Sequence, residues 1–392
     1  MKIVHRFLVL AALLSISFIG TMSAQNAFLE TDLVANSKPL IDSNGIVHTP
    51  LQVDPHLLNP WGVGESGGSP FWVSDNNAGV STLYNTAGTP LALVVSIPAP
   101  GDPLGSSGTP TGLVFNINGG ATGGFRISGF TKAGAPVTAS AIFLFSTEDG
   151  TILGWNPNVN PAGFDPAKAG TYAIIAVDNS AVPDAANGAV YKGLAIATDS
   201  NGRTLLYAAN FRSGKLEVYD NKFATPSNPA LPFDAFTDPK LKTGYAPFNI
   251  VSANGKLFVT YAVQDETRHD DVAGQSHGIV DTFNLDGSGQ RRFAQHGQLN
   301  SPWGVAVAPA SFGQFAGDIL IGNFGNGHIN VYSPGGEFLD KLRDPNGQAI
   351  VIDGLWTLRV GNGGNGGDLN KVYFTAGPNG ETDGLFGSLS PQ

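Results

Sequence analysis

The stretch that decides the fold is Pro302-Trp303-Gly304-Val305, followed by Leu320-Ile321-Gly322-Asn323-Phe324 and then by Gly327-His328-Ile329-Asn330-Val331-Tyr332. It has the pattern of three strands: one led by a small residue, one almost continuously apolar, and one that alternates. The chain carries six copies of this motif, which begin Asn59-Pro60-Trp61-Gly62, Pro110-Thr111-Gly112-Leu113, Tyr191-Lys192-Gly193-Leu194, Pro247-Phe248-Asn249-Ile250, Pro302-Trp303-Gly304-Val305 and Leu355-Trp356-Thr357-Leu358. Six copies of one supersecondary unit predict a solenoid or a propeller.

The spacing of the copies decides between these architectures. The intervals are 50 residues from Gly62 to Gly112, 56 from Gly193 to Asn249, 55 from Asn249 to Gly304 and 53 from Gly304 to Thr357. A four-stranded propeller blade needs roughly 40 to 50 residues, and no segment after the N-terminal apolar run sustains the apolar period of a helix. We therefore expect an all-β, six-bladed β-propeller. The interval of 81 residues from Gly112 to Gly193 predicts an insertion.

The two ends of the chain indicate how the ring closes. The sixth copy runs out after its third strand, at Leu389, close to Gln392. Upstream of the first copy, Thr31–Ala35 has the pattern of a strand but no blade of its own. We expect this N-terminal strand to complete the last blade, because closure removes an exposed strand edge. The termini of the propeller should then lie close together.

Composition and the N-terminus indicate an exported protein with one rigid domain. Lys2 and Arg6 precede an apolar run, Phe7–Gly20, and small residues end this segment at Ala24. This is the pattern of a signal peptide, which predicts that residues 1–24 are removed, that residues 25–392 form a single propeller domain, and that the protein is secreted or periplasmic. No second apolar segment predicts a transmembrane span in the mature chain. The chain has 52 Gly, 26 Pro and no Cys, so stability must come from burial and closure.

Charge restricts the class of partner. The formal net charge is −10 and the pI is about 5.0. Nucleic acids and anionic membranes require basic patches, so neither is expected as a partner. A protein, a peptide or a glycan remains open.

Oxygen-bearing side chains fall in the loops that should surround one mouth of the central channel. A ring of such ligands suits a hard cation such as calcium, and the metal ligands predicted on this basis are Glu148, Asn210, Asn249, Asp265 and Asn323. Asp and Asn beside glycine are also ordinary turn residues, which is the alternative for each of them.

The densest group of polar residues is the loop 264–278, which contains four carboxylates and both His269 and His277. The histidines suit zinc or copper and the carboxylates suit calcium. The same residues could act as a general acid and base, which makes His269 and His277 the candidate catalytic residues. A solvated polar loop without chemistry is the third interpretation, because no recognised ligand spacing is present.

Several motifs carry a resemblance to a known family. They include Asn-Pro-Trp-Gly at 59–62, Pro-Phe-Trp-Val-Ser-Asp at 70–75, Pro-Trp-Gly-Val-Ala-Val-Ala-Pro at 302–309 and Gly-Asn-Phe-Gly at 322–325. The chain resembles an uncharacterised family of exported bacterial proteins that is similar to NHL-repeat and six-bladed lactonase-type propellers. The resemblance implies the fold but supplies no activity.

Two functions remain open at this point. The first is a binding or scaffold propeller that uses its loop-rich channel face, which is favoured by the lack of a catalytic signature. The second is a metal-dependent, calcium-type hydrolase or lyase of the lactonase-like kind. A purely structural surface protein has the same sequence features as the first.

Overall fold

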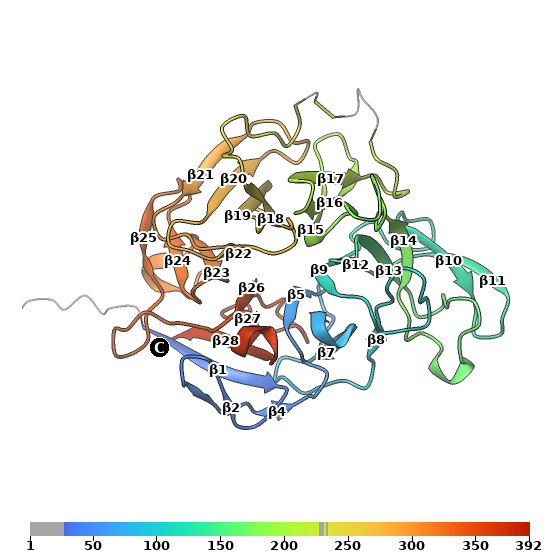
Figure 1. Ribbon diagram of the computed structural model, residues 1–392. Coiled ribbons are helices and arrows are strands. Elements are labelled where there is room, and N and C mark those ends of the chain that lie inside the picture. The colour runs from blue at the N-terminus through green and yellow to red at the C-terminus, as the bar shows by residue number, and fades with distance from the viewer. Residues whose placement is uncertain (1–26, 227–230, 233) are drawn as a thin grey trace, which may run out of the picture.

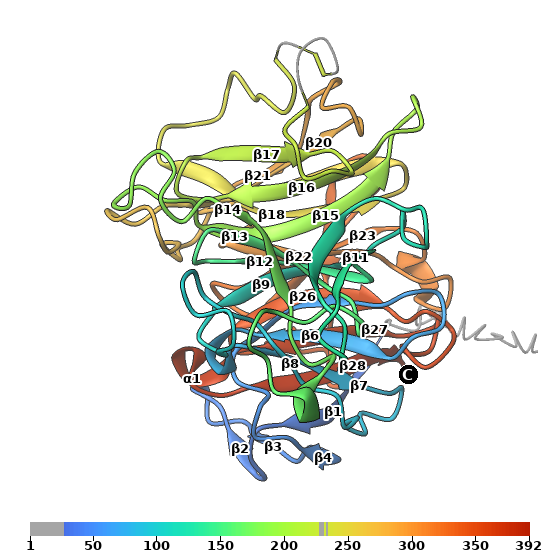
Figure 2. The ribbon, with the colours of Figure 1, turned by 90° about the vertical axis from the view of Figure 1, so that its right-hand side faces the viewer.

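Six β-sheets surround a central axis in the computed structural model, which describes residues 27–226, 231–232 and 234–392 (Figure 1). The six-bladed β-propeller predicted from the repeats is confirmed. Figure 2 shows the ring from the side, with the blades packed face to face. The predicted signal peptide, residues 1–24, lies outside the described residues.

The first strand of each blade lines the channel, and the strands within a blade pair antiparallel except for one parallel pair at the outer edge of the last blade. The first three blades, from inside outward, consist of β5 (Pro60–Gly64), β6 (Phe71–Asp75), β7 (Val80–Tyr84) and β8 (Val95–Ser96); β9 (Pro110–Phe115), β12 (Phe143–Thr147), β13 (Thr151–Trp155) and β14 (Ile174–Asp178); and β15 (Tyr191–Thr198), β16 (Thr204–Asn210) and β17 (Lys215–Tyr219). The next two blades consist of β18 (Tyr245–Ala253), β19 (Lys256–Val263), β20 (Ile279–Phe283) and β21 (Arg291–Gln295); and β22 (Pro302–Val307), β23 (Ile319–Asn323), β24 (Ile329–Tyr332) and β25 (Phe338–Lys341).

The last blade combines both ends of the chain. Its order is β26 (Leu355–Val360), β27 (Val372–Ala376), β28 (Leu385–Pro391), β1 (Phe28–Ala35) and β4 (Gln52–Val53). β1 pairs antiparallel with β28 from Phe28 opposite Pro391 to Ala35 opposite Leu385. The backbone N–H of Gln392 donates to the carbonyl of Ala27 at 2.9 Å. The predicted closing strand is therefore confirmed, and it begins earlier than the pattern at 31–35 indicated.

The remaining strands and helical turns lie outside the six blades. The long interval in the second repeat contains a hairpin of β10 (Arg126–Phe130) and β11 (Pro136–Ser140), which is the predicted insertion. A second hairpin, β2 (Leu40–Ile41) with β3 (Val47–His48), follows the closing strand. The helical turns are η1 (Asn76–Ala78), η2 (Pro166–Lys168), η3 (Gly313–Phe315) and α1 (Pro378–Glu381). Within the described part of the chain, no helix is both long and apolar enough to cross a membrane.

Small residues let adjacent inner strands approach each other closely. A Cβ atom added to Gly112, in the second blade, would overlap the backbone nitrogen of Leu194 in the third. The inner strands enclose a cavity of about 410 Å³ whose lining includes the ion pair between Glu65 and Arg359, 2.7 Å apart.

The contact at Gly112 generates the first prediction. Gly112→Ala should lower the free energy of unfolding by roughly 1 to 3 kcal/mol, because the backbone of Leu194 has no room to move away. Gly67→Ala is the matched control, since a Cβ at Gly67 meets nothing within 4 Å and neither glycine has a positive φ. Denaturant unfolding of both variants measures the difference. Equal stabilities would contradict close contact between the blades.

Candidate functional site

Aromatic side chains cluster at the start of the inner strands. The residues that precede the small residue of each repeat are Trp61, Thr111, Lys192, Phe248, Trp303 and Trp356. The three tryptophans and Phe248 belong to one buried cluster, in which Trp356 stacks on Trp61 with ring centroids 3.5 Å apart and on Phe324 at 4.0 Å. Aromatic contacts of this kind stabilise beyond their buried area. The repeated tryptophans therefore pack against one another.

Lys192 occupies the aromatic position of the third repeat. Its side chain is 2% exposed, and its ammonium lies 5.1 Å from the ring centre of Trp61. The ammonium donates to Glu148, in the loop between β12 and β13, and to Asp270 at 3.0 Å, in the loop between β19 and β20. Burial by itself lowers the pKa of Lys192, and the two carboxylates more than offset this, so its pKa is raised. Lys192 is therefore a buried cation at neutral pH.

Two further carboxyl groups lie near this ion pair. Asp271 follows Asp270, and one of its buried side-chain oxygens has no hydrogen-bond partner among the described residues. Glu381, at the end of α1, accepts a hydrogen bond from the side chain of Asn59 at 2.7 Å. Burial, with the charges of Glu148 and Asp271, raises the pKa of Glu381 to about 7, and burial also raises the pKa of Asp271. We call Lys192, Glu148, Asp270, Asp271 and Glu381 the channel-mouth network.

The network has an excess of negative charge. One lysine from the third blade faces four carboxyl groups from the second, fourth and sixth blades. Lys192 neutralises Glu148 and Asp270 directly, whereas Asp271 and Glu381 have no lysine or arginine within ion-pair distance among the described residues. Side chains that are distant in sequence thus meet at one point because the loops of different blades converge there.

Of the five predicted metal ligands, Glu148 is the one that enters this network. It also accepts a hydrogen bond from Asn76 at 2.9 Å. Asp265 lies in the same loop as Asp270, where its carboxylate accepts from the backbone of His269 at 2.8 Å and holds the turn.

The three predicted amide ligands hold neighbouring strands and loops. Asn210 donates to Glu217 at 2.6 Å, Asn249 to the carbonyl of Trp303 at 2.8 Å and Asn323 to the carbonyl of Gln298 at 2.7 Å. The structure does not gather these side chains with Glu148 into one hydrogen-bonded group. Their assignment to a metal remains a prediction.

The two candidate catalytic histidines differ in position. His269 Nδ1 lies 2.9 Å from Asp270 Oδ1, and Glu148, His269 and Asp270 bring ligand atoms within 4.8 Å of one another. His277 Nδ1 lies 2.9 Å from the carbonyl of Val272, within its own loop. The loop 264–278 therefore reaches the channel mouth through His269, Asp270 and Asp271.

Sequence reasoning missed Lys192 and did not single out Asp271 or Glu381 as site residues. A signal for Lys192 was present, because an alignment of the six repeats places a lysine in a column dominated by aromatic residues. A buried lysine must pair with groups of opposite charge. Because the partners of Lys192 come from other blades, they indicate a functional site.

A lysine substitution tests the buried ion pair. We expect Lys192→Met to lower the free energy of unfolding by roughly 3 kcal/mol at pH 7, because Glu148 loses its partner while mostly buried. Adding Glu148→Gln should restore part of the loss, and Lys222→Met, at an exposed lysine, should change little. Denaturant unfolding measures all three variants. A single variant as stable as the parent would show that Lys192 is not a buried partner of Glu148.

Comparison with known proteins places the chain among uncharacterised relatives. No protein-family model matches it. Among solved structures, a protein of unknown function from Bacteroides thetaiotaomicron has 10% identity and a TM-score of 0.50 over 94% of this chain and 77% of that one. Virginiamycin B lyase from Staphylococcus aureus has 10% identity and a TM-score of 0.47 over 93% and 99%. These likenesses concern the fold alone.

Relatives found by sequence have higher identity to this chain than these solved structures do. Uncharacterized protein R648 of Acanthamoeba polyphaga mimivirus is 30% identical over 351 residues, which cover 88% of this chain and 77% of the relative. Uncharacterized protein L690 of the same virus is 31% identical over 338 residues, 86% and 81% of the two chains. The bacterial origin implied by the motif resemblance remains a prediction beside these viral relatives. At this identity and coverage, the chain belongs to the family of these uncharacterised mimivirus proteins.

Proposed function

We propose that the protein is a binding propeller that acts outside the cytoplasm and holds a cationic group of a protein or peptide partner at its channel mouth. The observation that carries this proposal is the pair of carboxyl groups, Asp271 and Glu381, that lies beside the ion pair of Lys192 with no lysine or arginine within ion-pair distance of its own among the described residues. An ammonium or guanidinium group brought there would gain two charge-assisted partners.

The surroundings support a cationic ligand. A charge interacts more strongly at a half-buried site than in bulk water, so a partner's cation would be worth more here than on an open surface. Asp270, with its side chain 67% exposed, and the partly exposed His269 form the solvent side of the network, so a ligand can approach there. The net charge of −10 would also steer a basic partner toward the protein.

A metal-dependent hydrolase or lyase is the second candidate. It is favoured by the grouping of Glu148, His269 and Asp270, whose ligand atoms lie within 4.8 Å of one another. Against it, the ammonium of Lys192 already pairs with two of these three groups. A metal ion there would have to displace a buried lysine, whereas a partner bound through Asp271 and Glu381 leaves the lysine in place.

Export is proposed from the sequence of residues 1–24 alone. The charged start, the apolar run and the small residues at its end are the parts that a signal peptidase recognises. We expect protein recovered from the periplasm or the medium to begin at Gln25, which N-terminal sequencing measures. Retention in the cytoplasm with Met1 intact would overturn this part of the proposal.

Calorimetric titration with short peptides tests the binding proposal. At pH 8 and low salt, tetra-arginine should bind and tetra-glutamate should not. Asp271→Asn and Glu381→Gln should each weaken binding about tenfold or more, because each removes a charged partner of the cation. Glu266→Gln, at an exposed carboxylate of the same loop, is the matched control and should change affinity little.

The pH dependence gives an independent readout. The folded-state pKa of Glu381 is about 7, so the group is ionised at pH 8 and largely protonated at pH 6. Affinity for tetra-arginine should therefore fall between pH 8 and pH 6, and Glu381→Gln should reduce that fall. Because the folded-state pKa of Glu381 is raised, ionisation of this group lowers the free energy of unfolding as the pH rises to about 7. Gln cannot ionise and avoids this loss, so the Glu381→Gln variant should remain folded at pH 8. Binding of a neutral glycan in place of the basic peptide would overturn the cationic-ligand proposal.

A further inference from the structure

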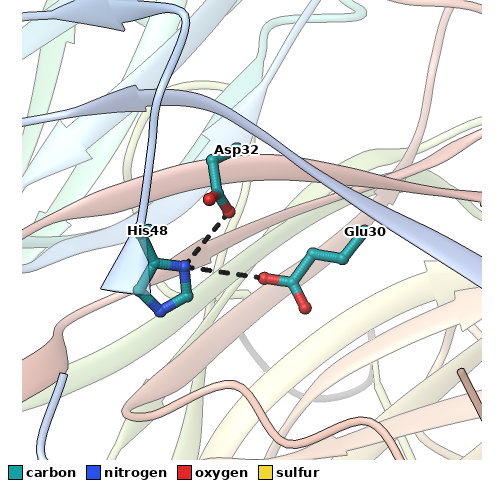
Figure 3. Close-up of side chains that lie close together, drawn as sticks. All are labelled: Glu30, Asp32 and His48. Carbon is teal, nitrogen blue, oxygen red and sulfur yellow. Dashed lines mark hydrogen bonds and ion pairs between the residues drawn. The ribbon is translucent and has the colours of Figure 1, made fainter. Parts of the chain in front are cut away.

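We propose that Glu30, Asp32 and His48 bind a divalent transition-metal ion of the zinc type at the outer edge of the last blade. The site is separate from the channel-mouth network and does not depend on the proposed function. Figure 3 shows both carboxylates directed toward the same nitrogen of the imidazole ring.

The closing strand and the following hairpin build the site. Residues two apart on a strand share one face, so β1 presents Glu30 and Asp32 together. The register of β1 against β28 shifts just after Asp32, where a β-bulge re-aims the side chains that follow into the core. β3 brings His48 opposite them, with its side chain 6% exposed. The three residues therefore meet because the chain closes its ring here.

The distances fit a zinc-type ion. His48 Nδ1 lies 3.2 Å from Asp32 Oδ1 and 4.0 Å from Glu30 Oε1. In a tetrahedral site with metal bonds of about 2.0 to 2.1 Å, neighbouring ligand atoms are about 3.3 Å apart. Asp32 and His48 already have this spacing. A small shift of the Glu30 side chain, which is 26% exposed, would close the remaining gap and leave a fourth position for solvent.

The other nitrogen of the ring faces a buried carboxylate. His48 Nε2 lies 3.7 Å from Asp42 Oδ2, and the Asp42 side chain is completely buried. Asp42 is fixed because its other oxygen accepts from the backbone of Asn44 at 3.0 Å and of Ile46 at 2.7 Å. Metal-ligating histidines commonly donate their second N–H to a carboxylate, and Asp42 is an ion-pair neighbour of Nε2 that would take this role if the two groups moved into hydrogen-bond distance. The arrangement therefore directs Nδ1 toward the metal position.

Charge supplies the reason for a cation. Glu30, Asp32 and Asp42 have one ion-pair partner among the described residues, His48, and no lysine or arginine. Even a protonated imidazole leaves two negative charges uncompensated. The side chains of Asp42 and His48 are 0% and 6% exposed, so water screens these charges poorly. A bound dication would supply the missing charge and hold both carboxylates ionised.

Calorimetric titration of the purified, untagged, chelator-treated protein with zinc chloride tests the proposal. We expect one zinc ion per chain in this site at pH 7.5, and a rise in melting temperature on saturation. His48→Gln should weaken zinc binding at least a hundredfold, and Asp42→Asn about 10- to 100-fold, because it alters only the partner of the bound ring. Glu30→Gln is the second ligand variant, at a partly exposed position that the fold should tolerate.

Two controls locate the ion. His56→Gln changes a half-exposed histidine close by in the sequence, which pairs with Asp54 at 3.0 Å, and should leave affinity unchanged. The double variant Glu148→Gln with His269→Gln removes the other group of ligand atoms, so retained zinc binding assigns the ion to the edge site. Absence of zinc binding, or binding that His48→Gln does not weaken, would overturn the proposal. A His48→Gln variant that loses stability at pH 6 in chelator, without any zinc effect, would show an ion-paired histidine instead.

Discussion

Close approach of adjacent inner strands around the ring axis is the constraint on which the rest of the structure depends. Gly62, Gly112, Gly193 and Gly304 all stand where an added Cβ would overlap the next blade, at Thr111, Leu194, Asn249 and Trp356 respectively. In four of the six repeats, the same position thus makes close contact with the next blade. The glycine in these four motifs is therefore explained by packing between adjacent blades, because a side chain there would push the two inner strands apart.

The close contact at the small residue of these repeats also determines where the side chain of the preceding residue lies. Where this residue is aromatic, it joins the cluster of Trp61, Trp303 and Trp356 at the start of the inner strands. Where it is Lys192, the same geometry forces an ammonium into an apolar position, and the cost of burying it is offset by Glu148 and Asp270. The repeat itself gives no packing reason for a lysine in this column. Lys192 departs from the repeat and needs Glu148 and Asp270 from two other blades as partners. A functional role explains this arrangement more readily than a contribution to stability does.

The fold was predictable because its signals are local and repeated. Each copy carries its strands and its small residue within about one blade length, and the unpaired strand pattern before Asn59 matched the missing strand at the C-terminus. The candidate site was predictable only in part, through Glu148 and the loop 264–278. Asn249 shows why: its amide bonds to the carbonyl of Trp303, a blade away, and nothing in the sequence distinguishes that bond from metal ligation. The edge site of His48 lies outside the repeats, so no alignment of copies could indicate it.

Ring closure does more than complete a sheet, because the N-terminal segment also positions the channel mouth. The hairpin of β2 and β3 contacts the loop that contains α1, where Asn379 donates to the carbonyl of Ile41 at 2.8 Å. Two residues further on, Glu381 accepts from Asn59, and the same Asn59 accepts from the indole of Trp356 at 2.9 Å. A continuous set of contacts therefore runs from the closing segment to the aromatic cluster at the axis. The place of Glu381 in the channel-mouth network therefore depends on contacts with residues from both ends of the chain.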